Sequence, residues 1–355
     1  MNFIDIDGSD KMMKRLEFDT LSSFQVRTMI RLIIIPVIAL LIAFTVPATS
    51  QDDLNALDYI PPGYFLSGWQ ATGNEFLSYP VNMGYLLSDD LPLLYEFDCV
   101  WYASETYESG NDQMIVEIFE FPGAADVFGF YSLSYIEPPE PDAAVVMPNY
   151  EMPPPPQIDT VRHVTRGGTE WMEGYQDRFY FRITVEEEFL VQSGLHVGIY
   201  MLANLPGQAI PANMVAILPG NNRIHGTERY IRGPVGLDLL IDTGGYDILG
   251  FDQYDYRGVV GQYRLGGGEY YLLFIAEYED ADTAGAVAGR LQGYFQDRDW
   301  ETVMLGPMSD GTHPRGFSSE KHIAFWSVED KLVLLWDLSE LEELQSALGQ
   351  MENQL

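Results

Sequence analysis

The sequence predicts an α+β fold of two similar halves, and three observations support this prediction. A β-rich apolar run, a sharp turn and a helix-forming run follow one another at Gln113–Tyr135, and the same order recurs at Tyr270–Phe295. Each of these strands follows another strand and a turn, which is the pattern of an antiparallel hairpin. Helices that follow hairpins cover the resulting sheet. We therefore expect the order β-β-α-β-β-α in each half, with the helices on one face of each antiparallel sheet.

The two copies match at individual positions. Glu120-Phe121 corresponds to Glu277-Tyr278, and Ala124 corresponds to Ala281. In both copies an acidic-aromatic pair ends the strand and an alanine-containing helix follows. We interpret this match as an internal repeat.

Size and composition indicate a folded protein. The chain has 355 residues, enough for two domains of ordinary size. Hydrophobic residues make up 46% of the chain and aromatic residues 13%, which supplies material for packed cores and excludes a disordered composition.

The chain is strongly acidic, with a net charge of −34. The first fifty residues carry five basic and five acidic groups, so the whole net charge belongs to the remainder, where Lys321 and Lys331 are the two lysines. We expect no nucleic-acid partner, because phosphate binding needs Lys and Arg. The acidic surface is expected to serve solubility. A high-salt habitat and weak binding of divalent cations remain alternatives.

The N-terminal region predicts export. Leu32–Val46 is the most apolar run, about fifteen residues long and shorter than the roughly 20 residues of a spanning helix. Arg27 and Arg31 precede it, and Ala48-Thr49-Ser50 places small residues before a cleavage point. This pattern is typical of a secretory signal peptide, so we expect a periplasmic or extracellular protein without stable membrane insertion after cleavage.

Two alternatives concern this predicted signal peptide, residues 1–50. A long polar leader precedes the apolar run, so translation starting at Met29 would leave the usual short basic region. If the segment is not cleaved, it anchors the protein to a membrane.

Cys99 is the sole cysteine. It cannot form a disulfide within the chain, and no cysteine at the predicted cleavage point is available for a lipid. A metal site built from cysteines is therefore excluded.

The first predicted half begins after a turn-rich lead-in at residues 51–95. Cys99–Tyr107 and Gln113–Phe121 form a hairpin around Glu108–Asp112. The helix that follows has one apolar face, with the spacing i, i+3, i+4, i+7: Ala124, Val127, Phe128 and Tyr131. The proline-rich run Ile136–Gln157 then predicts an exposed loop, because proline cannot donate to a strand ladder.

The first half ends with a second hairpin and a helix. Thr169–Val185 turns at Gln176–Arg178, and Phe179, Phe181 and Ile183 share one face. The helix that follows carries Leu195, Ile199 and Leu202 and stops at Leu205-Pro206-Gly207.

The second half repeats this order. Gly258–Leu265 and Glu269–Tyr278 form a hairpin around Gly266–Gly268, and Asp280 is the expected N-cap of the next helix. Ile323–Val328 and Lys331–Trp336 form the next hairpin, which turns at Glu329-Asp330 and matches Asp330 with Asp177. The last helix begins with Ser339-x-x-Glu342, a capping box.

The predicted domains are, in order, a signal peptide with polar leader (1–50), a lead-in (51–95), a first α+β repeat (96–207) with a proline-rich loop (136–157), a connecting segment (208–251) and a second repeat (252–355).

Two motifs resemble a known family. The strand ending at Glu120-Phe121 is followed by Ala125–Ser132, ADVFGFYS, and Leu218-Pro219 precedes Tyr230–Pro234, YIRGP. These segments resemble a bacterial family of exported proteins with a domain of unknown function, whose helix begins with DAFG(I/V)(Y/F)S. The resemblance covers most of residues 60–300. It implies export and a paired-repeat fold, and it implies no substrate.

The chain departs from this family before the first hairpin. The family tends to have a segment of small residues of the Asn-Gly-Gly-Ala type there, whereas this chain has Leu87–Leu91, LSDDL. A role of that segment in the relatives cannot be transferred to this protein.

Asp242-Thr243-Gly244 resembles the active-site turn of aspartic proteases. That chemistry needs two carboxylates about 3 Å apart that share a proton. The sequence has no second Asp-Thr/Ser-Gly, and Gly245-Tyr246 is not the usual continuation. We expect a turn at the end of a strand.

Other catalytic and metal motifs are absent from the sequence. The histidines lack the spacing of a zinc site, and we expect surface or strand-face positions for His163, His196, His225, His313 and His322. No Gly-x-Ser-x-Gly elbow occurs, and Gly266–Gly268 lacks the lysine and helix of a phosphate loop.

An acidic cluster could bind calcium, and the tryptophans could bind sugars. Six carboxylates lie close in sequence without the spacing of a calcium loop, so we expect a solvated acidic face: Asp252, Asp255, Glu277, Glu279, Asp280 and Asp282. Six tryptophans could form a platform for sugars, but their strand positions favour the core: Trp69, Trp101, Trp171, Trp300, Trp326 and Trp336.

We therefore expect an exported, non-enzymatic binding or interaction module, with a groove between its two repeats. The alternative is a secreted hydrolase that acts on carbohydrate through two carboxylates. The sequence identifies neither catalytic nor binding residues, and it predicts no metal and no cofactor. The partner stays open between a small molecule, a carbohydrate and a protein.

Overall fold

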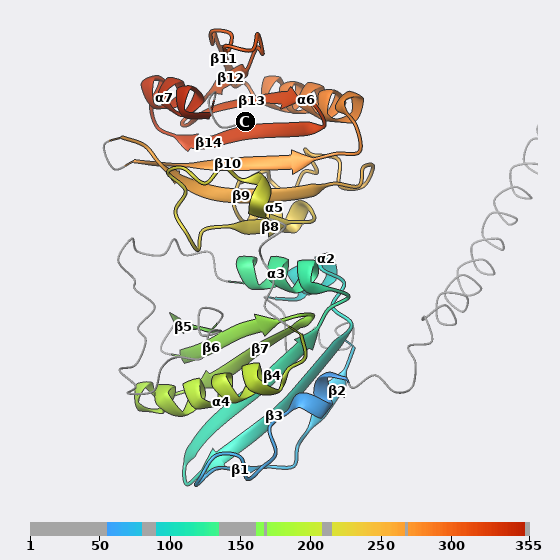
Figure 1. The fold of residues 1–355 in the computed structure, drawn as a ribbon, viewed down its shortest axis with the longest axis vertical. Coiled ribbons are helices and arrows are strands. Elements are labelled where there is room, and N and C mark those ends of the chain that lie inside the picture. The colour runs from blue at the N-terminus through green and yellow to red at the C-terminus, as the bar shows by residue number, and fades with distance from the viewer. Residues whose placement is uncertain are drawn as a thin grey trace, which may run out of the picture. The chain divides into compact units, whose positions relative to one another are not determined.

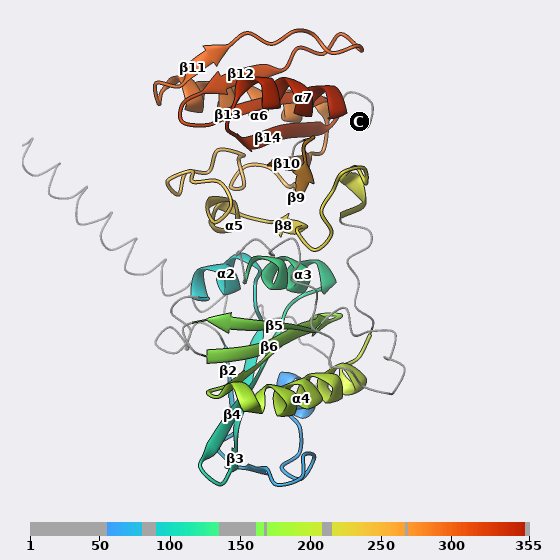
Figure 2. The ribbon, with the colours of Figure 1, turned by 90° about the vertical axis from the view of Figure 1, so that its left-hand side faces the viewer.

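The computed structural model describes residues 55–79, 90–134, 161–166, 169–207, 215–266 and 269–351. The predicted signal peptide (1–50) and proline-rich loop (136–157) lie outside these ranges. Residues Leu54–Leu355 form one compact unit, drawn as a ribbon in Figures 1 and 2.

The first half is a seven-stranded antiparallel sheet in the order β1-β3-β4-β7-β6-β5, with β2 also paired to β3. Its strands are β1 (Gln70–Ala71), β2 (Phe76–Ser78), β3 (Trp101–Ser109), β4 (Asp112–Glu120), β5 (Val161–Arg166), β6 (Thr169–Gln176) and β7 (Phe179–Val185). Its helices are η1 (Ala56–Tyr59), α2 (Leu91–Glu96), α3 (Ala124–Leu133), η4 (Glu188–Leu190) and α4 (Val191–Asn204).

The second half is also a seven-stranded antiparallel sheet, in the order β11-β12-β13-β14-β10-β9-β8. Its strands are β8 (Arg229–Ile231), β9 (Arg257–Arg264), β10 (Tyr270–Glu277), β11 (Glu301–Val303), β12 (Arg315–Ser318), β13 (His322–Val328) and β14 (Lys331–Leu338). Its helices are η5 (Val215–Ile217), α5 (Pro234–Asp238), α6 (Ala281–Gln296) and α7 (Leu341–Met351). The predicted α+β class with two antiparallel sheets is confirmed.

The helices of the first half pack on opposite faces of its sheet, not on one face as expected. Successive strand residues point to alternate faces. Phe119 and Tyr180 contact Phe130 of α3, whereas the Met172 side chain, on the other face, lies against Gly194 of α4. The central strands are apolar on both faces, so each face needs a cover.

The second sheet is covered in the same way. Phe295 of α6 contacts Phe325 and Trp336 on one face. The register places Tyr271 on the other face, where its hydroxyl contacts Gln350 of α7 at 3.4 Å. Helices therefore lie on both faces of each sheet.

The sequence prediction missed β5, β11 and β12. β5 and β12 each precede the second hairpin of their half. From β3 the observed order in the first half is β-β-α-β-β-β-α rather than β-β-α-β-β-α, and from β9 the second half has one more strand, β11, before β12. β5 alternates basic and small side chains, VRHVTR, and β12 has four residues, RGFS, so neither has the apolar alternation of a strand. The segment 208–251, predicted as a connection, supplies β8 to the second sheet.

The two halves share one hydrophobic core. Buried residues run without interruption from Phe119 and Phe130, through Ile231 and Leu237, to Phe274. A separate core lies on the α4 face of the first sheet. Figures 1 and 2 show α2 and α3 between the strands of the first sheet and β8 with α5, in agreement with the contacts between these elements. The junction is therefore part of the folded core.

Candidate binding site at the junction of the two halves

The segments ADVFGFYS (Ala125–Ser132) and YIRGP (Tyr230–Pro234) meet at the junction. The backbone N–H of Tyr230, in YIRGP, donates to the Ser132 hydroxyl of ADVFGFYS at 3.2 Å. That hydroxyl donates to the carbonyl of Gly129 at 2.9 Å. Both groups are buried, so this pair satisfies the backbone donor of the middle residue of β8.

Arg232 links the halves by two ion pairs. Its guanidinium donates to Asp126 of α3 at 2.9 Å and also to Asp98, which follows α2. Burial raises the pKa of Asp126, and Arg232 opposes this shift by favouring the carboxylate. The Asp126 side chain is 16% exposed, so its ion pair is partly shielded from water.

Glu96 forms a second link, in which the α2 carboxylate meets the first residues of α5. It accepts hydrogen bonds from the N–H groups of Val235 at 2.8 Å and Gly236 at 3.1 Å. A Cβ at Gly233 would lie 2.4 Å from the Glu96 carboxylate, and a Cβ at Gly236 would lie 2.7 Å from Leu133. The two glycines therefore permit the close approach of the halves. Burial raises the pKa of Glu96, and the N–H groups offset this in part.

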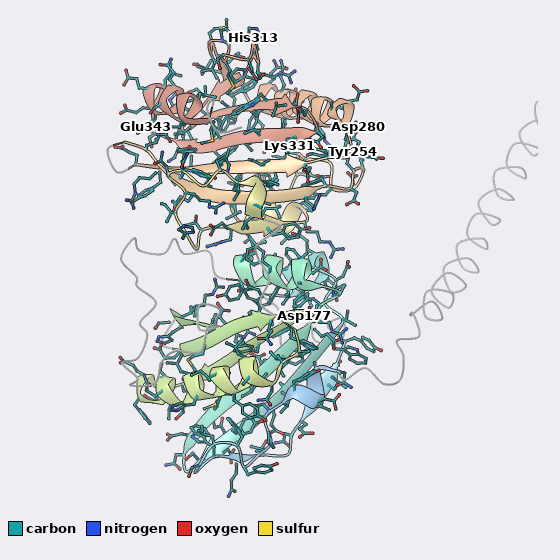
Figure 3. All side chains as sticks on the ribbon, viewed as in Figure 1. Asp177, Tyr254, Asp280, His313, Lys331 and Glu343 are labelled. Atoms are coloured by element: carbon teal, nitrogen blue, oxygen red, sulfur yellow. The ribbon has the colours of Figure 1, made fainter. Side chains whose placement is uncertain are left out.

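A pocket of about 390 Å³ opens beside these links. Its lining residues all belong to the second half: Tyr230, Arg232, Phe251, Asp252, Gln253, Tyr254, Asp255 and Tyr256. Tyr254, labelled in Figure 3, lies on the loop that precedes β9. The first half contributes to this pocket by holding Arg232 in place through Asp98 and Asp126.

Tyr256, one of the lining residues, carries an unsatisfied polar group that is closed to solvent. The residue is 8% exposed, and its ring packs against Phe251 at 4.7 Å and Tyr278 at 5.1 Å between ring centroids. Among the described residues, its buried hydroxyl has no hydrogen-bond partner. An unpaired buried hydroxyl costs about 1–3 kcal/mol. Burial raises the pKa of Tyr256, so the hydroxyl keeps its proton and can donate as well as accept.

Asp252, a lining residue, forms a carboxylate pair with Asp247. Asp247 accepts from the N–H groups of Gly250 at 2.7 Å and Phe251 at 2.9 Å, which fixes the loop. Burial acts to raise the pKa of Asp247, but the hydrogen bond from Asp252 and the backbone donors lower it on balance. The same hydrogen bond to Asp247 raises the pKa of Asp252. As the pH falls, Asp252 therefore takes up a proton before Asp247 does.

The acidic residues singled out in the sequence divide between several sites. Asp252 and Asp255 line the pocket. Glu277 instead pairs with Arg257 at 2.8 Å, and Asp280 caps α6 by accepting from the N–H of Thr283 at 2.7 Å, as predicted. Within the described ranges, no group of three His, Cys, Asp or Glu is placed to hold a metal ion.

The protease-like turn has a structural role. Asp242 accepts from the N–H of Gly244 at 3.1 Å. The neighbouring Asp238 accepts from the Thr243 hydroxyl at 2.7 Å and from the N–H of Gly245 at 3.0 Å. Both glycines have positive φ, 64° and 73°, a conformation that other residues rarely adopt. These contacts explain the Asp-Thr-Gly-Gly run as a folded loop.

The histidines and tryptophans do not gather at the pocket. His163 lies 2.6 Å from Glu170 on the first sheet, and His313, labelled in Figure 3, lies between β11 and β12, away from Tyr254. Trp69 and Trp326 are buried, in line with a core role. The sequence did not single out Tyr256, because only the tertiary structure shows that its hydroxyl lacks a partner.

Comparisons with known proteins give no family for this chain. No family model matches, and no curated protein matches. One solved structure, described as "Structure of crystal form III of TP0453", aligns over 85% of this chain and 99% of that chain, with 9% sequence identity and a TM-score of 0.19. A TM-score this low carries no argument about fold or function. Among the described residues, no helix has the length and apolarity needed to cross a membrane.

Proposed function

We propose that this protein is an exported, non-enzymatic binding module and that the junction pocket is its ligand site. One observation carries the proposal: the buried Tyr256 hydroxyl, unpartnered among the described residues, lies on a residue that lines a pocket of about 390 Å³. A ligand group that reaches this hydroxyl would satisfy it and recover the cost of leaving it unpaired. Binding sites for small molecules are concave and contain a few placed polar groups of this kind.

We further propose that the two halves are repeats of one unit, with the pocket beside their junction. The strand order β3-β4-β7-β6-β5 has the counterpart β9-β10-β14-β13-β12. Arg162 of β5 donates to the carbonyl of Tyr131 in α3 at 2.7 Å, and Arg315 of β12 donates to that of Ala288 in α6 at 2.7 Å. The turns before β7 and β14 have positive φ at Asp177 and Glu329. The counterpart of Asp177 is thus Glu329, one residue before Asp330.

The proposal of export rests on the apolar run Leu32–Val46 and the small residues before Gln51. The N-terminal sequence of protein recovered outside the cytoplasm is expected to begin at or near Gln51. Recovery of the full-length chain in the membrane fraction would instead identify the run as an anchor.

The binding function can be tested by measuring thermal unfolding of the purified protein with small cationic, neutral and anionic probes. Any probe that binds the folded state raises the midpoint of unfolding as its concentration rises. We expect at least one class to do so, and Tyr256→Phe to reduce the shift. Tyr64→Phe is the matched control, because Tyr64 is 87% exposed. A shift that Tyr256→Phe leaves unchanged would place binding elsewhere.

The Asp247–Asp252 pair favours a second candidate, a two-carboxylate hydrolase. The pKa of Asp247 is lowered and that of Asp252 is raised. In such hydrolases, a difference of this kind lets one carboxyl group act as the acid and the other as the base or nucleophile. Against this, Asp247 is occupied by backbone donors. Release of nitrophenol from aryl glycosides that is lost in Asp252→Asn would establish the hydrolase. We expect no such release.

A further inference from the structure

We propose that the ligand of the junction pocket is an organic cation with a primary ammonium group. This inference rests on the proposed function and specifies the chemical class of the ligand. It draws on three features of the pocket: its charge, its aromatic walls and the hydroxyl of Tyr256.

The charge of the pocket favours a cation. Asp252 and Asp255 are exposed on its wall. Arg232, the one basic residue among its lining residues, is bridged by Asp98 and Asp126, so these three side chains together carry one negative charge. The net charge of the chain, −34, adds a field that concentrates cations and repels anions. An anionic ligand would have to displace an aspartate from Arg232.

Four aromatic residues stand among the lining residues, and the exposed surface of the pocket is mostly polar. Tyr230, Phe251, Tyr254 and Tyr256 line it. Aromatic faces attract ammonium groups within about 6 Å and also cover the alkyl body of such a ligand. Carboxylates beside aromatic rings therefore match an alkylammonium better than a bare metal ion, and the described residues hold no metal-binding cluster.

Tyr256 distinguishes a primary ammonium from a quaternary one. Its hydroxyl oxygen can accept an N–H hydrogen bond, and among the described residues nothing donates to it. The hydroxyl is closed to solvent in this structure, so a ligand reaches it only as side chains at the pocket floor shift. A primary ammonium carries three donors, enough for Tyr256 and for Asp255 or Asp252. A quaternary ammonium carries none.

Matched probes test this inference directly. n-Butylammonium, butyltrimethylammonium, 1-butanol and butyrate share one alkyl body and differ in charge and donors, and maltose represents neutral sugars. Titration calorimetry on the purified full chain at low and physiological salt gives each dissociation constant. We expect butylammonium to bind most tightly. Its affinity should fall several-fold from 0.01 M to 0.15 M NaCl, because the Debye length falls from about 30 Å to about 8 Å.

Three variants connect binding to the pocket. Asp255→Asn removes a full charge from the wall and is expected to weaken butylammonium binding about tenfold, whereas Glu320→Gln, an exposed residue outside the pocket, is expected to leave it unchanged. Tyr256→Phe is expected to weaken binding while the unfolding midpoint of the free protein stays equal or rises, because the substitution removes an unsatisfied hydroxyl. A tyrosine with a purely structural role would change the midpoint and leave binding unaltered.

The outcomes separate the inference from the function on which it rests. If maltose, 1-butanol or butyrate binds more tightly than butylammonium, and Tyr256→Phe weakens that binding, the pocket is a binding site and the inference of a cation is wrong. Equal affinities for butylammonium and butyltrimethylammonium would show that Tyr256 does not accept a hydrogen bond from the ligand. If no probe binds at any salt concentration, both the inference and the proposed function are overturned.

Discussion

In each sheet, five residues on neighbouring strands lie side by side in a row. At corresponding positions, the central residues of this row are charged in the first sheet and apolar in the second. In the first sheet the register aligns Ser104, Glu117, Arg182, Glu173 and Arg162 across β3, β4, β7, β6 and β5. In the second sheet the corresponding row across β9, β10, β14, β13 and β12 is Val260, Phe274, Leu334, Phe325 and Arg315.

The ionic row is closely partnered. Arg182 donates to Glu117 at 2.8 Å and to Asp90 at 2.8 Å, and Arg162 pairs with Glu173. The hydroxyl of Tyr102 donates to Glu117 at 2.9 Å, and that of Tyr180 donates to Glu173. The two glutamates are at most 7% exposed. Such charges are tolerated in a sheet face only because each has several partners.

The apolar row shows that this backbone does not need the charges. Phe274, Leu334 and Phe325 are fully buried at the corresponding positions. Apolar burial brings stability without a desolvation cost, whereas a buried ion pair roughly balances its attraction against the loss of hydration. The comparison therefore predicts that the ionic row adds specificity of pairing rather than net stability to the first sheet.

The largest effect is expected from breaking the ionic row. Arg182→Met leaves Glu117 and Asp90 without their shared cation, which is expected to lower the free energy of unfolding by about 3–5 kcal/mol. Denaturation in urea measures this value. Replacing Glu117 and Arg182 together by methionine should restore part of the loss, because Glu173 keeps its pair with Arg162 and the remaining Asp90 side chain is 22% exposed. A double variant less stable than Arg182→Met would show that the charges stabilise the first sheet.

A smaller effect is expected at the junction, which joins the two sheets. Gly233→Ala places a Cβ 2.4 Å from the Glu96 carboxylate, and overpacking of this kind costs about 1–3 kcal/mol of unfolding free energy. Gly285→Ala in α6 is the matched control, because no atom lies within 4 Å of its Cβ position. Alanine favours a helix interior, so the control should be stabilised by up to about 1 kcal/mol. Equal stability of the two variants would contradict the close approach at Glu96.

The pH dependence of stability should differ between the halves. Burial raises the pKa of Glu96 in the first half above its unfolded value, so its contribution to stability is present below the unfolded pKa and is lost as pH rises through the folded pKa. Backbone N–H groups lower the pKa of Asp280 in the second half, so its contribution is lost as pH falls.

Unfolding curves recorded between pH 3 and pH 7 give the free energy of unfolding at each pH. Glu96→Gln should remove the part of the unfolding free energy that the native protein gains as the pH falls. Asp280→Asn should remove the part that it gains as the pH rises toward neutral. Opposite signs in the two variants are the expected result. The same sign in both would mean that one of the two carboxylates has a different environment from the one described.

The smallest effect is expected from salt, because surface charges interact weakly through water. Screening of the net charge of −34 should raise the unfolding midpoint by a few degrees in NaCl. CaCl₂ at the same ionic strength should do little more, since the described residues contain no metal-binding cluster. A saturable gain at submillimolar Ca²⁺ would show that carboxylates such as Asp252 and Asp255 bind the ion.

Local pattern was sufficient for most helices and hairpins. The hairpin of β9 and β10, the N-cap Asp280 and the helix after Phe121 all lie close to their predicted places. The capping of α7 differs in detail, because Glu343, not Glu342, accepts from the N–H of Ser339 at 2.8 Å. These features depend on neighbours in sequence, which explains why periodicity and turn residues located them.

The sequence by itself determined the α+β class, the order of most elements and the acidic surface, because these follow from local periodicity and composition. Only the tertiary structure decided which faces the helices cover, since the central strands are apolar on both. It also decided that YIRGP contacts ADVFGFYS, and that Tyr256 has a buried hydroxyl without a partner among the described residues. Such contacts join residues far apart in the chain, and their energy depends on burial and on neighbours that no local pattern specifies.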